Sequence, residues 1–204
     1  MVMKEDPLNI VITGVGGQGN IMASAILASA AVRDGLYVSV GETYGASQRG
    51  GAVMSHVRLY EKDQCGPLIP EGKAHLILGF EPVECLRSIG VFGNQSTKAI
   101  VNPKPVYPVD VLSGEAKYPT VQEMLRAMKE LVDRVYVVEA AKIAMEAGNV
   151  VLQNIVMAGC LIGSELTPLT TESAKDVIKE IFPNKTESYL KAFKLGVQEV
   201  RKTR

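Results

Sequence analysis

The chain has 204 residues, of which 47% are hydrophobic and 22% are charged, so it is long enough to bury one sizeable core. Lysine plus arginine and aspartate plus glutamate number 22 each, and this zero net charge argues against a nucleic-acid surface or a polybasic membrane patch. A near-neutral surface does little to keep molecules apart, which favours a chain that works inside a complex.

The cysteines Cys65, Cys85 and Cys160 form no C-x-x-C pair. We therefore expect no iron–sulfur or zinc site built from this chain alone, but free thiols in a reducing compartment. The first nine residues include acidic side chains and no long apolar stretch, unlike a signal peptide. No segment reaches the ~18 apolar residues of a membrane span, so we expect a cytoplasmic protein.

The first forty residues predict a strand, a glycine turn, a helix and a second strand. Residues 8–13 (LNIVIT) are rich in branched side chains and bounded by glycine, which is typical of a buried strand. The glycine run at 14–19 (GVGGQG) is followed by an alanine-rich helix at 20–33 and a strand at 37–40. We expect a βαβ unit with parallel pairing of the two strands.

The rest of the chain alternates between short apolar runs and helical patterns. Residues 41–51 (GETYGASQRGG) contain four glycines and predict a loop. Further strands are expected at residues 52–59, 75–79, 98–101 and 135–138. Further helices are expected at residues 81–89, 121–132, 139–147 and 150–162, and in two amphipathic segments that close the chain, the first capped by Thr170 or Thr171.

Residues 102–119 contain four prolines, so we expect an extended excursion that is neither helix nor central strand. Taken together, these elements predict one α/β domain over residues 1–204. It is a three-layer, Rossmann-like fold with a mostly parallel sheet and helices on both faces.

Gly14, Gly16 and Gly19 match G-x-G-x-x-G between a strand and a helix. Glycine permits the tight turn and lets backbone N–H groups approach a phosphate, while the helix N-terminus adds partial positive charge. A dinucleotide site also needs an acid about 20 residues on, at the end of the second strand. Glu42 lies near that position but follows Gly41 inside the expected loop. A dinucleotide, another anionic group, and a packing role at a subunit contact all stay open.

The second glycine loop carries Arg49 between Gln48 and Gly50, and an arginine there can clamp a carboxylate or a phosphate bidentately. A surface salt bridge or an interface pair is the alternative. The candidate cofactor-binding residues are Gly14, Gly16, Gly17, Gln18, Gly19, Glu42, Tyr44, Gln48, Arg49 and Gly50. No base–nucleophile pair is evident, so we predict no catalytic residue and no metal ligand in this chain.

The two histidines, His56 and His75, lie in or next to predicted strands and form no metal pair with the cysteines. We expect both to be packed or hydrogen-bonded residues rather than catalysts. Asn154, on an otherwise apolar helix, is a buried polar group that needs a partner and is expected to be structural.

Four sequence runs, GVGGQG, GETYGASQRGGAVMSHVR, GPLIPEGKA and EPVECLR, resemble the small beta subunits of indolepyruvate:ferredoxin oxidoreductases. More broadly, they resemble the gamma domain of the 2-oxoacid:ferredoxin oxidoreductases. The resemblance covers Asn9 to about Phe193, and QRGG together with PLIPEG favours the indolepyruvate branch over the pyruvate branch. Many members carry histidine where this chain has Tyr44.

The resemblance implies a subunit of an enzyme that oxidatively decarboxylates an aryl pyruvate with coenzyme A and reduces ferredoxin. Thiamine diphosphate and iron–sulfur clusters perform this chemistry in such enzymes. This chain lacks a GDG run followed by asparagine, so these groups are expected in a larger catalytic alpha subunit. We hypothesise that the glycine loops pack on that subunit and help to form the coenzyme A channel. The alternatives are a free-standing NAD(P)- or FAD-binding module and a purely structural interaction subunit.

Overall fold

The computed structural model describes residues 3–44, 51–62 and 65–203. One mixed sheet has the strand order β2-β3-β1-β4-β5-β6. The strands are β1 (Leu8–Val15), β2 (Tyr37–Tyr44), β3 (Ala52–Tyr60), β4 (Leu76–Gly79), β5 (Lys98–Val101) and β6 (Arg134–Val137). The helices are α1 (Asn20–Arg33), α2 (Pro82–Phe92), α3 (Val109–Leu112), α4 (Val121–Leu131), α5 (Ala140–Glu146), the 3-10 turn η1 (Val150–Leu152), α6 (Gln153–Gly163), α7 (Thr171–Ile181) and α8 (Thr186–Lys202).

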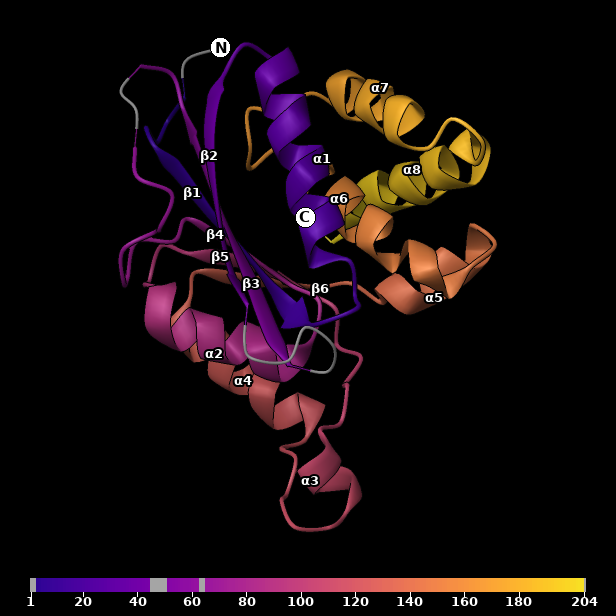
Figure 1. Ribbon diagram of the computed structural model, residues 1–204. Coiled ribbons are helices and arrows are strands. Elements are labelled where there is room, and N and C mark those ends of the chain that lie inside the picture. Colours follow the sequence, from indigo (N-terminus) through magenta and orange to yellow (C-terminus); the bar gives the residue numbers. More distant parts are fainter. Residues whose placement is uncertain (1–2, 45–50, 63–64, 204) are drawn as a thin grey trace.

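Helices cover both faces of the sheet, which confirms the three-layer α/β fold (Figure 1). The helices α1 and α5–α8 lie on one face, and α2 and α4 lie on the other. Strand β1 serves both cores because successive side chains point to opposite faces. Ile10 and Ile12 are buried in the core under α1, and Val11 is buried in the core under α2. No helix among these residues combines the length and the apolar character needed to cross a membrane.

The pairing predicted for the first βαβ unit is wrong. Strands β1, β4, β5 and β6 pair in parallel, but β3 lies between β1 and β2 and is antiparallel to both. The reason is local, since a short connection between β2 and β3 favours an antiparallel hairpin over a crossover. Five of the six strands still run in the same direction, as expected for a mostly parallel sheet.

Two expected boundaries are also corrected. Residues 41–44, expected in a loop, continue β2, because Gly41, Glu42, Thr43 and Tyr44 pair with β3 in register. The proline-rich residues 102–119, expected to hold no helix, contain α3. Its N-cap is Pro108, so the prolines flank this turn rather than interrupt it, and proline disrupts only a helix interior.

The register of the parallel strands aligns their carboxyl ends. Thr13 of β1 pairs with Gly79 of β4, and Gly79 pairs with Val101 of β5. The glycine loop after β1 and the proline-rich segment after β5 therefore leave the sheet at the same edge. In open α/β sheets this edge is where ligands bind.

Candidate functional site

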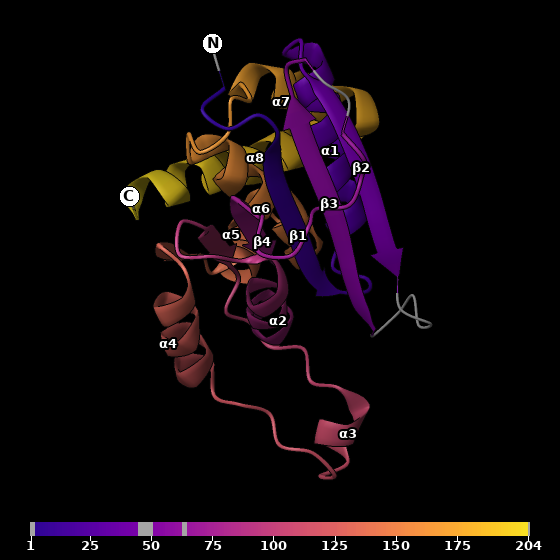
Figure 2. The same ribbon diagram turned by 90° about the vertical axis from the view of Figure 1, so that its left-hand side faces the viewer.

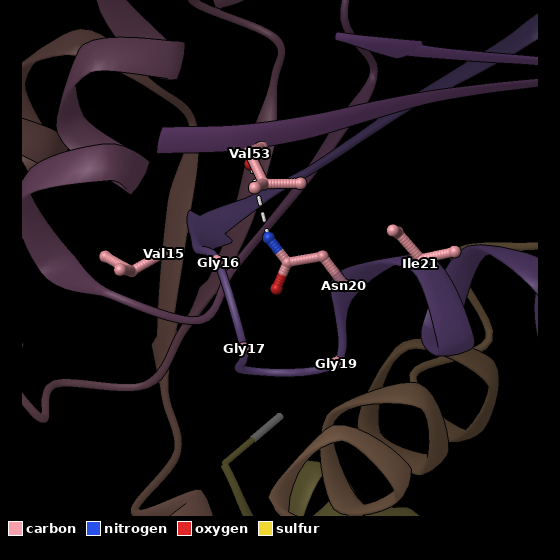
Figure 3. A pocket seen from close by; sticks show the side chains of 7 residues that line it. All are labelled: Val15, Gly16, Gly17, Gly19, Asn20, Ile21 and Val53. Carbon is pink, nitrogen blue, oxygen red and sulfur yellow. Dashed lines mark hydrogen bonds between the residues drawn. The ribbon is translucent and has the colours of Figure 1, made fainter. Parts of the chain in front are cut away.

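A cavity of about 390 Å³ opens beside the glycine loop that joins β1 to α1 (Figure 3). It is lined by Val15, Gly16, Gly17, Gly19, Asn20, Ile21 and Val53. The lining combines backbone of the loop, the first turn of α1 and the start of β3. Three of the predicted site glycines thus line one cavity.

The glycines of this loop are required by the turn and by close packing. Gly17 and Gly19 have φ of 99° and 89°, a left-handed backbone that favours glycine. A Cβ on Gly19 would lie 2.5 Å from Nδ2 of Asn154, and one on Gly14 would lie 2.8 Å from Cβ of Phe80. The end of β1 therefore packs on Phe80, which follows β4, and the end of the loop packs on α6, while Gly17 stays exposed at the tip.

Gln18 braces the loop from inside. Its Oε1 accepts a hydrogen bond from the Val15 backbone N–H at 2.8 Å, and its Nε2 donates to the Phe80 carbonyl at 3.1 Å. The Gly16 N–H donates to the Gly51 carbonyl at 2.8 Å, which ties the loop to the chain just before β3. The predicted site residue Gln18 does not line the cavity, but its hydrogen bonds hold the loop that does.

The first turn of α1 offers backbone donors to the cavity, and a buried acceptor lies behind them. Gly19 is the N-cap and no side chain caps the helix, so the first N–H groups and the partial positive charge of the helix are available there. Asn20 is only 3% exposed, and its Nδ2 donates to the Val53 carbonyl at 3.2 Å. Its Oδ1 has no hydrogen-bond partner among the described residues and points away from Val53, toward the loop (Figure 3).

An unpaired buried oxygen costs free energy, about 1–3 kcal/mol on average. A group that donates a hydrogen bond to Asn20 Oδ1 would recover part of this energy. The uncapped helix N-terminus suits the cavity to a ligand with anionic oxygens, whereas Asn20 Oδ1 lies behind the cavity surface.

Glu42 does not occupy the position of a ribose-binding acid. It lies in β2, which β3 separates from β1, so the two strands are about 10 Å apart at the usual spacing. Its carboxylate accepts a hydrogen bond from the Ser24 hydroxyl of α1 at 3.3 Å. Tyr44 ends β2, paired with Val53. The predicted residues Gln48, Arg49 and Gly50 lie outside the described residues.

Two of the three thiols, Cys85 and Cys160, are buried in the protein core. Burial raises the pKa of Cys85 and of Cys160, so both stay protonated. Cys85 packs in the core under α2 and Cys160 in the core on the opposite face of the sheet. Among the described residues, no group of histidine, cysteine, aspartate or glutamate side chains could hold a metal ion. An iron–sulfur cluster does not fit this part of the chain.

Both histidines are hydrogen-bonded residues, as predicted. Nδ1 of His75 accepts from the Asn9 N–H at 2.9 Å, and Nδ1 of His56 accepts from the Ile69 N–H at 3.3 Å. Burial lowers the pKa of both.

Asn20, Ile21 and Val53 line the cavity and were not singled out by the sequence pattern, and Asn154 was expected to be structural. Asn154 is half-buried, and its side chain packs against Gly19 while its Oδ1 accepts from the Ile155 N–H at 2.9 Å. An asparagine directly after the last glycine of the motif was the available signal for Asn20. Asn154 is far away in sequence, so its place beside the loop emerges only from the fold.

The chain matches the family model of pyruvate ferredoxin/flavodoxin oxidoreductase over residues 9–199. It belongs to this family. It is 45% identical over 201 residues to indolepyruvate oxidoreductase subunit IorB of Thermococcus kodakarensis, with 98% of each chain covered. It is 29% identical over 200 residues to pyruvate synthase subunit PorC of Methanothermobacter thermautotrophicus, covering 97% of this chain and 98% of that one.

Among solved structures, the chain resembles 2-oxoglutarate:ferredoxin oxidoreductase from Magnetococcus marinus with a TM-score of 0.74 at 22% identity. The match covers 98% of this chain and 32% of that much longer chain, and it shows a shared fold. The chain is therefore a non-autonomous subunit of an oxidoreductase of the 2-oxoacid:ferredoxin type, as the sequence predicted. The comparisons give no support to a free-standing nucleotide-binding module.

Proposed function

We propose that this chain is the small subunit of an indolepyruvate-type 2-oxoacid:ferredoxin oxidoreductase in the cytoplasm. The complex would convert an aryl pyruvate and coenzyme A to an acyl-CoA and carbon dioxide, with electrons passed to ferredoxin. The observation that carries this proposal is the 45% identity to an indolepyruvate subunit, against 29% to a pyruvate subunit of nearly the same coverage.

The redox chemistry belongs to the larger subunit in this proposal. Thiamine diphosphate there supplies the electron sink, and iron–sulfur clusters carry the electrons. The described residues of this chain offer no metal-binding cluster, and both buried thiols are protonated. This chain would contribute a rigid loop, hydrogen-bond donors and shape at the edge of the active site.

The cavity at the glycine loop is the proposed contact for coenzyme A. Coenzyme A carries phosphates, which suit the uncapped N-terminus of α1. Gly17 has no side chain to obstruct the approach. The Magnetococcus enzyme was solved with coenzyme A and succinyl-CoA bound, which supports the proposal by analogy.

Reconstitution tests the subunit function. The small and large subunits are purified separately, then assayed alone and together with indolepyruvate, phenylpyruvate or pyruvate and with ferredoxin as acceptor. We expect turnover only with both subunits present, and a kcat/KM for the aryl pyruvates well above that for pyruvate. Turnover by either subunit alone, or a preference for pyruvate, would contradict the proposal.

A charge series at Ile21 tests the coenzyme A contact separately. Ile21 is 48% exposed, lines the cavity and lies in the first turn of α1. We expect Ile21→Glu to raise the KM for coenzyme A about tenfold over Ile21→Gln, because its charge repels phosphate. Ile21→Lys should have a KM at or below that of Ile21→Gln.

The fold should tolerate this series, because Ile21 is 48% exposed and a single charge near a helix N-terminus changes stability by only about 0.3–1 kcal/mol, favourably for Glu and unfavourably for Lys. The KM for the 2-oxoacid is the internal control and should not change. Equal coenzyme A KM values in all three variants would show that coenzyme A does not bind at this cavity, without contradicting the proposed subunit function.

Arg49→Ala remains a prediction from sequence. We expect this substitution to lower the activity of the complex without unfolding the subunit.

A further inference from the structure

Residues 102–120, between β5 and α4, form an arm that projects from the domain. Figures 1 and 2 show its helix α3 standing apart from the sheet and from the other helices. Val109 and Leu112 of α3 are 78% and 73% exposed, and Val106 and Tyr107 on the limb before it are exposed as well. Single exposed apolar residues are ordinary, but four within seven positions of one projection mark an interaction surface.

A buried carboxylate fixes the base of the arm. Glu81 is 1% exposed and caps α2 by accepting a hydrogen bond from the Glu84 N–H at 2.9 Å. It also accepts from the Val106 N–H on the outgoing limb at 3.4 Å and from the Tyr118 hydroxyl on the returning limb. The Tyr107 and Tyr118 rings meet edge-on at 5.0 Å between centroids. Both limbs are therefore held at one point of the domain.

The tip of the arm is held by its own hydrogen bonds. The Ser113 N–H donates to the Val109 carbonyl at 2.8 Å, and the Ala116 N–H donates to the Asp110 carbonyl at 2.9 Å. Prolines on both limbs reduce the freedom of the unfolded segment. A segment that is locally ordered, yet buries none of its large apolar side chains at the tip, is preorganised for another surface.

We propose that this arm docks Val109 and Leu112 into an apolar groove of the larger subunit. This inference rests on the proposed function, because that function supplies the larger subunit. The arm and the glycine loop leave the sheet at the same edge, as the pairing of Thr13, Gly79 and Val101 requires. A subunit seated over the glycine loop therefore lies beside the arm.

The charge and the size of the arm favour the larger subunit as its binding partner over other partners. Lys104 and Lys117 balance Asp110 and Glu115, so the arm has no net charge to direct it to an acidic or basic surface. A second copy of this chain fits less well, because a stable dimer buries about 800 Å² per partner over a self-complementary surface. A narrow convex arm suits a groove in a different, larger protein.

The experiment measures binding of the purified small subunit to the purified larger subunit. We expect Val109→Ser/Leu112→Ser to weaken the affinity about a hundredfold, as loss of two central apolar anchors does. The matched control is Val32→Ser/Val151→Ser, which removes two valines of similar exposure, 61% and 67%, away from the arm. Its affinity should stay within about twofold of the wild type.

The melting temperature of each variant and light scattering of the isolated chain complete the test. The arm variant should have the same melting temperature as the wild type, because the side chains of Val109 and Leu112 are exposed. At saturating small subunit the kcat should be unchanged, whichever 2-oxoacid the complex prefers, so failure of the substrate assignment is visible separately. Wild-type affinity of the arm variant would overturn the proposal, and so would a homodimer that the arm substitutions dissociate.

Discussion

Glycines serve different purposes in two regions of this chain, the contact between α6 and α8 and the tip of the glycine loop. Between α6 and α8, a Cβ on Gly159 would overlap the Phe193 carbonyl, and a Cβ on Gly196 would overlap the Val156 carbonyl. At the glycine loop, a Cβ on Gly17 would meet no atom within 4 Å. Glycine lets two helices reach backbone contact in the first region. In the second, Gly17 supplies a left-handed turn with open space beside it, and Gly19 combines a left-handed backbone with close packing on Asn154.

The energetics of the two regions differ accordingly. The α6–α8 contact is a closed core in which each added atom must displace backbone, and cores packed this densely do not absorb extra volume. The loop edge keeps an uncapped helix N-terminus and a buried unpaired oxygen on Asn20. Such unsatisfied groups weaken the isolated fold and are retained where a ligand or partner can satisfy them.

The largest expected effect is therefore in the closed region. Gly196→Ala should lower the free energy of unfolding by about 3 kcal/mol, because its methyl group overlaps main-chain atoms that cannot move independently. Urea denaturation measures this change. Gly90→Ala in α2 is the matched control, since a Cβ there meets nothing within 4 Å, and it should stabilise the protein by about 0.5–1 kcal/mol. Equal effects of both substitutions would show that close helix contact is not what requires glycine at position 196.

A second comparison separates turn strain from packing inside the loop. Gly17→Ala forces a left-handed backbone on alanine and should cost about 1 kcal/mol. Gly19→Ala adds an overlap with the Asn154 side chain and should cost about 2–3 kcal/mol. In the Asn154→Ala background the excess for Gly19→Ala should shrink, because the amide is gone. If the excess persists undiminished, Asn154 does not set the position of the loop.

Local sequence signals determined some elements to the residue. The expected helix at 20–33 and strand at 98–101 match α1 and β5 because glycines or polar residues bound uniform apolar runs. The continuation of β2 through residues 41–44 could not be predicted in this way. Its glycine and polar side chains are typical of a loop, and only pairing with β3 makes it a strand. Non-local pairing overrides local propensity in sheets more often than in helices.

The candidate site likewise combines features that local sequence predicts with features that only the tertiary fold determines. The glycine run at residues 14–19 includes three residues that line the cavity, Gly16, Gly17 and Gly19. The motif did not predict that Gln18 would turn inward to Val15 and Phe80, because Val15 ends β1 and Phe80 directly follows β4, far away in sequence. Nor did it predict that Asn154, from α6, would lie against Gly19. Sequence spacing indicated where the backbone turns, and the tertiary fold decided which side chains meet there.

The smallest expected effect is on the pH dependence of stability. Burial lowers the pKa of His56 and of His75, and both accept a backbone hydrogen bond at Nδ1 in their neutral form. The unfolded chain then binds protons more readily than the folded one below pH ~6.5, so stability is fully present above that value and declines as the pH falls through the lowered folded pKa values. Thermal melts from pH 7.5 to 5 measure the decline. Neither histidine lies at the glycine loop or between α6 and α8, so wild type, Gly17→Ala and Gly196→Ala should lose stability in parallel. If one glycine variant lost stability more steeply with falling pH, acid would destabilise the region around that glycine directly. The two regions would then not respond to acid in the same way.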